Sequence, residues 1–233
     1  MSNNGKKLVL FDIDGTLISA GGAGTRSMNL AFHALFGIED AFRNIPMAGR
    51  TDPQIMKDGL KSHNLPYMDG NVGKMEAMYL EYLEREIQNS MRHLKPGIRE
   101  TLSTLRKMDV VIGLLTGNLE KGAGIKLNAF GLNDCFVDGA YGSDDEDRDK
   151  LLPVAIGKFA KKGLEFGPED CIVIGDTPRD VQCAKIHGAY CIAVATGPYT
   201  KESLLDTAAD IVIDSLEATD KYLDFIMSVM SGN

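Results

Sequence analysis

Residues 7–17 read KLVLFDIDGTL, an apolar run that ends in two aspartates and a glycine. The run KLVLF is apolar at every position but the first, which is typical of a parallel strand covered on both faces. Asp12 and Asp14 follow it, and side chains two residues apart point the same way along an extended chain. Gly15 lets the backbone turn away after them. The stretch therefore predicts a buried strand with two carboxylates at its carboxyl end.

Four further apolar runs resemble this first strand. They lie at residues 110–115, 171–175, 190–195 and 210–214. Helical patterns separate most of them, for example at 98–108, where apolar residues recur on one helix face. This alternation predicts an α/β fold with a Rossmann-like, doubly wound parallel sheet as its core.

The stretch from 19 to 92 breaks the alternation, because it contains helical patterns and loops without a convincing strand. An all-helical segment that follows directly after the first strand is expected to form a small second domain inserted in a loop. We therefore predict an α/β core made of residues 1–18 and 93–233, and a helical cap domain made of residues 19–92.

The composition limits the partners that the protein can have. The net charge is −8, and an acidic surface repels nucleic acid and anionic lipid. No apolar run reaches the length of a membrane span, and the N-terminus lacks the apolar stretch of a signal peptide. The four cysteines form no CxxC pair, which favours free thiols in a reducing compartment. We expect a cytoplasmic monomer or homodimer that binds a small molecule, with neither nucleic acid nor a membrane as partner.

A second pair of acids follows the run at 171–175. Asp176 and Asp180 stand where open α/β sheets bind their ligands, at the carboxyl end of a predicted parallel strand. If Asp12 and Asp14 lie at the same edge, four carboxylates would repel one another. A hard divalent cation with oxygen ligands removes that repulsion, and Mg²⁺ is the usual ion beside phosphate. These four acids are thus the predicted metal site.

Phosphate ligands are predicted after the run at 110–115 and further along the chain. Thr116, Gly117 and Asn118 offer a hydroxyl and free backbone N–H groups at a strand-to-helix turn, which suits phosphate oxygens. Arg148 and Lys150 precede an apolar helix, and a cation there would neutralise a bound phosphate.

Together these motifs resemble the haloacid dehalogenase-like hydrolase superfamily, and most of all its phosphoglycolate phosphatase-like branch, which carries a helical cap. FDIDGTL and GDTPRD are the most specific of them. The resemblance implies that Asp12 forms an aspartyl-phosphate and that Asp14 protonates the leaving alcohol and then activates water. It also implies that Thr116 binds phosphate, and that Asp176 binds Mg²⁺ beside Asp12 and the backbone carbonyl of Asp14. Asp180 would be a further acid of the metal site.

The third motif of the superfamily departs from its usual form here. Many relatives have Lys-Pro-x-Pro, whereas this chain has Lys150 with Pro153 three residues later and lacks the first proline. Some relatives use an arginine in a similar context, so Arg148 is a rival. The register of the proline favours Lys150, and the choice between the two cations stays open.

The resemblance implies a Mg²⁺-dependent phosphatase that hydrolyses a phosphate monoester of a small metabolite, with phosphoglycolate as the first expectation. A phosphomutase of the beta-phosphoglucomutase type is the alternative, because it also needs Asp14. A binding protein on a retained phosphatase scaffold belongs to a different class, and the intact acids argue against it.

The substrate's leaving group is expected to meet the polar turn of Gly49 and Arg50 in the helical segment. Arg50 would pair with a substrate carboxylate such as that of phosphoglycolate. The alternative is an ordinary helix start, with Thr51 or Asp52 as the N-cap and Pro53 in the first turn. Both interpretations can hold at once.

Overall fold

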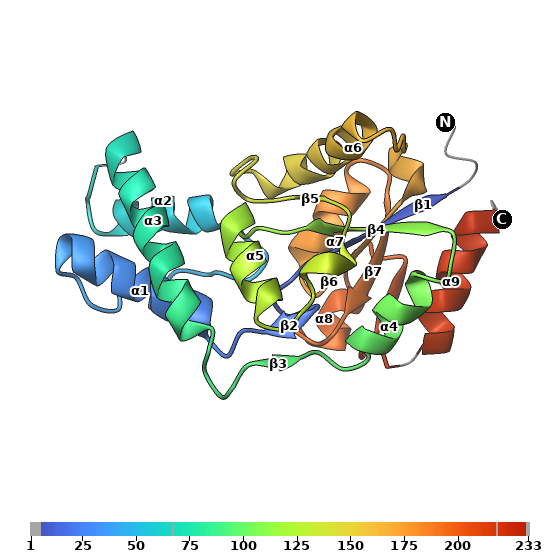
Figure 1. The fold of residues 1–233 in the computed structure, drawn as a ribbon, viewed down its shortest axis with the longest axis horizontal. Coiled ribbons are helices and arrows are strands. Elements are labelled where there is room, and N and C mark those ends of the chain that lie inside the picture. The colour runs from blue at the N-terminus through green and yellow to red at the C-terminus, as the bar shows by residue number, and fades with distance from the viewer. Residues whose placement is uncertain (1–5, 67, 218, 232–233) are drawn as a thin grey trace.

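The structure, a computed structural model, describes residues 6–66, 68–217 and 219–231. Its centre is a six-stranded parallel sheet in the order β5-β4-β1-β6-β7-β8 (Figure 1). The strands are β1 (Lys7–Phe11), β4 (Val110–Leu115), β5 (Gly139–Ala140), β6 (Cys171–Gly175), β7 (Tyr190–Val194) and β8 (Ile211–Ile213). The sheet and the helices that flank it confirm the predicted α/β class.

Helices cover both faces of the sheet, as a doubly wound fold requires. Val9 and Phe11 of β1 belong to one apolar cluster, whereas Leu8 and Leu10 belong to the other, because successive side chains of a strand point to opposite faces. The first cluster includes side chains of α4 (Ile98–Leu105), α5 (Glu120–Asn128) and α9 (Thr219–Ser231). The second includes side chains of α6 (Leu151–Lys161), α7 (Pro178–Lys185) and α8 (Lys201–Leu205).

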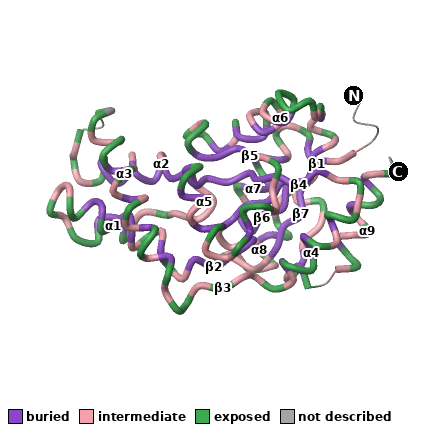
Figure 2. Tube along the Cα trace, in the orientation of Figure 1, coloured by how far each residue is buried: buried purple, intermediate pink, exposed green. Residues whose placement is uncertain are grey.

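The helical segment between β2 (Ile18–Ser19) and β3 (His93–Leu94) lies at one end of the molecule, away from α4, α6 and α9 (Figure 1). It contains α1 (Ala23–Phe36), α2 (Asp52–Ser62) and α3 (Asp69–Glu86). The chain enters through β2 (Ile18–Ser19) and leaves through β3 (His93–Leu94), which pair as a short antiparallel ribbon. Figure 2 marks buried residues in these helices, and their buried apolar side chains belong to the same cluster as those of α4, α5 and α9.

Local sequence signals explain where several helices begin and end. α1 stops at Gly37, which has a φ of 70°, a conformation that favours glycine. α2 begins after Thr51, whose hydroxyl accepts a hydrogen bond from the backbone N–H of Gln54 at 3.3 Å, with proline in the first turn. The expected helix start at this turn is therefore confirmed, with Thr51 as its N-cap.

Short elements escaped the sequence patterns. β5 has two residues, too few to show a period, and β2 and β3 are equally short. Three 3₁₀ turns occupy Asn133–Cys135, Arg148–Lys150 and Pro168–Asp170. Residues 1–5 and 232–233 of the predicted core domain lie outside the described residues. Within the described part of the chain, no helix combines the length and apolarity that a bilayer crossing requires.

Candidate active site

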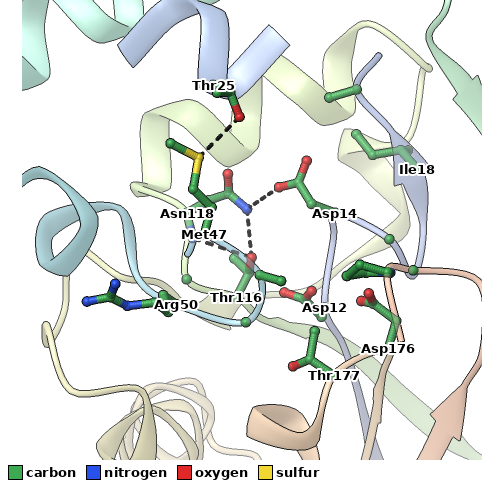
Figure 3. Close-up of a pocket in the computed structure, with 18 of the residues that line it drawn as sticks. Asp12, Asp14, Ile18, Thr25, Met47, Arg50, Thr116, Asn118, Asp176 and Thr177 are labelled. Carbon is green, nitrogen blue, oxygen red and sulfur yellow. Dashed lines mark hydrogen bonds between the residues drawn. The ribbon is translucent and has the colours of Figure 1, made fainter. Parts of the chain in front are cut away.

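The ends of three central strands meet at one edge of the sheet. Phe11 of β1 pairs with Leu114 of β4 and with Ile174 of β6, so the residues that follow these strands are level with one another. The backbone N–H of Asp12 continues this pairing and donates to the Ile174 carbonyl at 2.9 Å. The strand ends lead into a pocket of about 380 Å³ (Figure 3). Its lining includes nine of the predicted site residues, namely Asp12, Asp14, Gly49, Arg50, Thr116, Gly117, Asn118, Arg148 and Asp176.

Three buried carboxylates gather at this pocket, and two of them, Asp12 and Asp176, line it. Asp12, Asp176 and Asp180 each offer an oxygen, and these oxygens lie within 4.8 Å of one another. Burial raises the pKa of Asp12 to about 6. The positive charge of Arg148 opposes this increase, and the negative charges of the neighbouring acids add to it. Burial, reinforced by the charges of Asp180 and Asp12, raises the pKa of Asp176 well above its usual value. Such a cluster favours either a proton or a cation.

The donor set fits a magnesium ion. The Oδ2 atom of Asp176 is buried and has no hydrogen-bond partner among the described residues, although a buried carboxylate oxygen normally has one. Its other oxygen, Oδ1, accepts a hydrogen bond from the Thr16 hydroxyl at 2.9 Å. Carboxylate oxygens at this spacing are the ligands that Mg²⁺ prefers.

The backbone around Asp176 is shaped to admit its carboxylate. Gly15 has a φ of 92°, and a Cβ at that position would lie 2.3 Å from Asp176 Oδ2. A Cβ at Gly197 would lie 1.6 Å from the same oxygen. Neither position tolerates a side chain without moving Asp176. Gly15, which turns the chain after Asp14, thus also leaves room for the carboxylate of Asp176, the residue directly after β6.

The start of α7 fixes Asp180. Its Oδ2 accepts hydrogen bonds from the backbone N–H of Thr177 at 2.9 Å and from the Thr177 hydroxyl at 2.7 Å, as in a capping box. Its Oδ1 accepts a hydrogen bond from the Arg148 guanidinium. Asp180 therefore lies beside the cluster with most of its hydrogen-bonding capacity already used.

Of the two rival cations, Arg148 and not Lys150 lies against the acids. The Arg148 guanidinium is buried, 3.2 Å from Asp12 Oδ1. The Lys150 side chain is 63% exposed, its ammonium lies 3.4 Å from Asp145, and it is not part of the pocket lining. The preference for Lys150, based on Pro153, is therefore corrected. The 3₁₀ turn Arg148–Lys150 has three residues per turn, so side chains two residues apart point in different directions.

The predicted phosphate ligands after β4 lie together. Thr116 is buried, and its hydroxyl accepts a hydrogen bond from Asn118 Nδ2 at 2.8 Å (Figure 3). Asn118 Nδ2 also donates to Asp14 Oδ2 at 2.9 Å, so this side chain already links two residues of the site. The carbonyl of Gly117 accepts a hydrogen bond from the Asp52 N–H at 2.7 Å, and a Cβ on Gly117 would collide with the Arg50 carbonyl.

One residue of the site escaped the sequence patterns. The ammonium of Lys126 on α5 lies 2.6 Å from Asp14 Oδ2 and 2.5 Å from Asn118 Oδ1, and the residue is 4% exposed. A signal was present, because Lys126 lies on the face of α5 that also carries the buried Ala123 and Leu127. A lysine in an apolar stripe needs a buried partner, and the pattern alone does not say which.

Arg50 and Gly49 occupy the wall of the pocket next to α2. The Arg50 guanidinium contacts Asp58 and donates to Gln54 Oε1 at 3.2 Å, and Figure 3 shows it directed away from Asp12. Gly49 has a φ of 69°, and a Cβ there would lie 2.4 Å from the Thr177 hydroxyl. Arg50 thus has partners within its own segment, whereas Gly49 packs closely on the core.

Comparison with known proteins agrees with this site. The haloacid dehalogenase-like hydrolase family matches residues 6–188, which contain every residue of the carboxylate cluster. The chain belongs to this family. It is an enzyme of the phosphatase type, since its curated relatives are phosphatases.

Relatives of this haloacid dehalogenase-like hydrolase lie in the phosphoglycolate phosphatase branch. A phosphoglycolate phosphatase of Vibrio vulnificus (strain YJ016) is 26% identical over 223 residues, covering 90% of this chain and 92% of that protein. Phosphoglycolate phosphatase 1 of Pseudomonas aeruginosa (strain PAO1) is 29% identical, with 90% and 77% covered. The fold is also that of CbbY from Rhodobacter sphaeroides in complex with phosphate, at a TM-score of 0.73 and 17% identity, with 92% and 96% covered.

Proposed function

We propose that this hydrolase is a Mg²⁺-dependent phosphatase that cleaves small phosphate monoesters through an aspartyl-phosphate on Asp12. The observation that carries the proposal is the position of Asp12, directly after β1, 3.2 Å from the Arg148 guanidinium and beside the carboxylates of Asp176 and Asp180. Its carboxylate borders a pocket that also contains Asp14 and Thr116. A nucleophile, an acid/base group and a phosphate ligand are thus within one cavity.

In this proposal Asp12, Asp176 and the backbone carbonyl of Asp14 hold Mg²⁺, with Asp180 as a further acid of the site. When bound, the ion offsets the negative charge of the phosphate and of the carboxylates around it. The unpartnered Oδ2 of Asp176 and the close spacing of the three carboxylates support this assignment.

The chain's own groups perform the remaining steps. Asp12 Oδ attacks phosphorus and displaces the alkoxide, while Arg148 and the Thr116 hydroxyl stabilise the charge on the phosphoryl oxygens. Asp14 gives its proton to the leaving oxygen. It then takes a proton from water, which cleaves the acyl phosphate and regenerates Asp12.

We also propose that residues 19–92 act as a cap on the core formed by 1–18 and 93–233. The loop before α2 touches the core directly, because the N–H of Asp52 donates to the Gly117 carbonyl and the Thr51 hydroxyl donates to the Glu146 carbonyl at 2.7 Å. The proposal is supported by the pocket lining, which includes Thr25 and Met28 of α1 and Ile55 of α2 together with Asp12. A pocket of about 380 Å³ favours a small leaving group over a macromolecule.

Phosphoglycolate is the first substrate to test, because the relatives of Vibrio vulnificus and Pseudomonas aeruginosa are phosphoglycolate phosphatases. Conversion of a hexose 1-phosphate to its isomer without release of phosphate would instead support the phosphomutase alternative. A protein from Bacteroides vulgatus that is provisionally named a beta-phosphoglucomutase has the same fold, with a TM-score of 0.69. The predictions of a cytoplasmic location and of a monomer or homodimer are kept as part of the proposal, and gel filtration tests the second.

The test is a phosphate-release assay on p-nitrophenyl phosphate and on a panel of phosphorylated metabolites, with and without Mg²⁺. We expect turnover that requires Mg²⁺ and is abolished by EDTA. Turnover that is equal in EDTA would contradict the metal, and no phosphate release from any ester would contradict the enzyme class and favour a binding protein.

A further inference from the structure

The carboxylate of Asp14 is held from one side. Lys126 Nζ and Asn118 Nδ2 both donate to Oδ2, at 2.6 Å and 2.9 Å, and Oδ1 accepts no hydrogen bond from the residues that the structure describes. The Asp14 side chain is 41% exposed, whereas that of Lys126 is 5% exposed. Oδ1 is therefore the oxygen that remains available to a molecule in the pocket.

The Lys126 ammonium is rigidly placed. It donates to Asn118 Oδ1 as well as to Asp14, and Asn118 is itself tied to the Thr116 hydroxyl. Burial opposes its charge, but the carboxylates of Asp14 and Asp52 more than compensate, and the pKa of Lys126 is raised. It is thus a charged donor with little freedom to move.

Packing around α5 fixes the lysine further. The N–H of Leu119, just before the helix, donates to Asp52 Oδ2 at 2.9 Å, which ties α5 to the start of α2. Gly122 faces Tyr79 and Leu83 of α3 at ordinary contact distances. Gly24 of α1 lies beside both the Lys126 ammonium and the Tyr79 hydroxyl, each within 4 Å of where its Cβ would be. All three helices of the 19–92 segment therefore surround the lysine or its helix.

We propose that Lys126 is a positioning residue that, with Asn118, holds Oδ2 of Asp14 so that Oδ1 points to the oxygen of the leaving group. The inference rests on the proposed phosphatase function and adds to it a residue outside the motifs. Lys126 touches Asp14 and acts through it, since its ammonium has Asp14 and Asn118 as hydrogen-bond partners in the structure.

The role makes a prediction that depends on the leaving group. An alkoxide is a poor leaving group and needs the proton of Asp14, whereas p-nitrophenolate leaves without one. A displacement of about 1 Å can cost on the order of 100-fold in a positioned step. Loss of the lysine should therefore slow the transfer of phosphate to Asp12 from alkyl phosphates and largely spare that transfer from p-nitrophenyl phosphate, whereas general damage to the site should slow both transfers.

The experiment compares the wild-type protein with Lys126→Met, which keeps the length of the side chain and removes the ammonium, and with Lys126→Arg. The matched control is Lys121→Met on the exposed face of the same helix. With Mg²⁺ present, we expect Lys126→Met to lower kcat/KM about 100-fold on the best alkyl phosphate and less than about threefold on p-nitrophenyl phosphate, because kcat/KM reports the transfer of phosphate to Asp12 and omits the later hydrolysis that both esters share. Lys126→Arg should recover about tenfold of the loss in kcat/KM, and Lys121→Met should match the wild type.

A double-mutant cycle with Asp14→Asn separates positioning from structural damage. If Lys126 acts through Asp14, adding Lys126→Met to Asp14→Asn should cause no further loss on the alkyl ester. Equal losses of kcat/KM on the two esters, or independent losses in the cycle, would overturn the proposal. Should Lys126→Met unfold at the assay temperature, Lys126→Gln is measured by the same criteria. Wild-type protein without turnover would overturn the phosphatase and the positioning role together, whereas an active wild type with an unselective Lys126→Met overturns the positioning role alone.

Discussion

Nη2 of the Arg148 guanidinium lies 3.2 Å from Asp12 Oδ1 and also contacts Asp180 Oδ1. It thus joins the 3₁₀ turn before α6 to the ends of β1 and α7 and provides a positive charge beside the nucleophile. Lys150, two residues later, has its partner in Asp145 at the surface.

We expect Arg148→Met to lower kcat/KM by at least about 100-fold, because a phosphate ligand is lost and two buried acids lose their counter-charge. Lys150→Met should stay within about twofold of the wild type, since its ion pair is exposed. Steady-state kinetics on one ester measures both variants, with melting temperatures recorded beside them. A larger loss in Lys150→Met than in Arg148→Met would reverse the assignment of the cation.

Asp12→Asn should abolish turnover and leave the fold intact, because asparagine fills the same space but is not a nucleophile. Single-turnover experiments with labelled substrate should show no protein-bound phosphate in this variant. Asp206→Asn, at an exposed position after α8, is the matched control and should behave as the wild type. Full activity in purified Asp12→Asn protein would refute the proposed mechanism.

Magnesium binding should weaken as the pH falls through about 6, the value to which burial raises the pKa of Asp12. Below that pH the carboxylate holds a proton, and a protonated carboxyl is a poor ligand for Mg²⁺. Calorimetric titration at pH 5 and pH 7.5 should show at least about fivefold weaker binding at the lower pH. Asp176→Asn should lose most of the affinity at both values, and pH-independent binding in the wild type would place the ion elsewhere.

Burial raises the pKa of Asp52 from its ordinary value of 3.8 to about 6. The free energy of unfolding should therefore depend on pH through this residue. A raised carboxyl pKa means that the folded state binds the proton more tightly than the unfolded state does. The stabilisation of the folded state by protonated Asp52 is therefore fully present below pH 3.8 and is lost as the pH rises through about 6. The loss is on the order of 2–3 kcal/mol for about two pKa units.

Asp52→Asn has no proton to lose, and its amide oxygen can still accept the hydrogen bond from Leu119. Its melting temperature should therefore rise relative to the wild type between pH 4 and pH 7. The difference in melting temperature between Asp206→Asn and the wild type should not change with pH over this range. A wild-type and Asp52→Asn pair that melt in parallel across this range would contradict the raised pKa.

Gly197→Ala should displace the Asp176 carboxylate, because its new Cβ would lie 1.6 Å from Oδ2. We expect loss of Mg²⁺-induced stabilisation and of activity in this variant. Gly157→Ala is the control, since it lies in α6 with no heavy atom within 4 Å of its Cβ, and it should gain about 0.5–1 kcal/mol of stability. Unchanged thermal shifts by Mg²⁺ in Gly197→Ala would exclude this carboxylate as a ligand.

The sequence predicted the parts of the molecule that depend on local patterns. The apolar runs marked β1, β4, β6, β7 and β8 to within one residue at each end, because buried parallel strands need nearly continuous apolar residues. Their order along the chain also predicted that Asp12, Thr116 and Asp176 would lie at one edge. β5 has two residues, which is too short for any pattern.

Long-range contacts were the parts that the sequence did not reveal. Lys126 finds its partners in residues from β1 and β4, and only the packing of α5 shows which acids it meets. The choice between Arg148 and Lys150 depended on the rotation of a single 3₁₀ turn, which proline spacing does not report. The assignment of residue roles and of the cap boundaries stays a prediction.

The chain enters the helical segment through β2 and leaves it through β3. Because Ser19 pairs with His93, these two connections lie side by side. The two ends of the helical segment are neighbours in space. The segment can therefore be deleted and replaced by a few residues, or exchanged for one of different length, without changing the order or path of the strands in the sheet. Deleting or shortening the segment would expose the sheet edge that carries Asp12 to bulkier phosphoesters such as phosphorylated peptides. The short ribbon β2–β3 is thus a natural graft point for engineering selectivity while leaving the chemistry of the sheet edge in place.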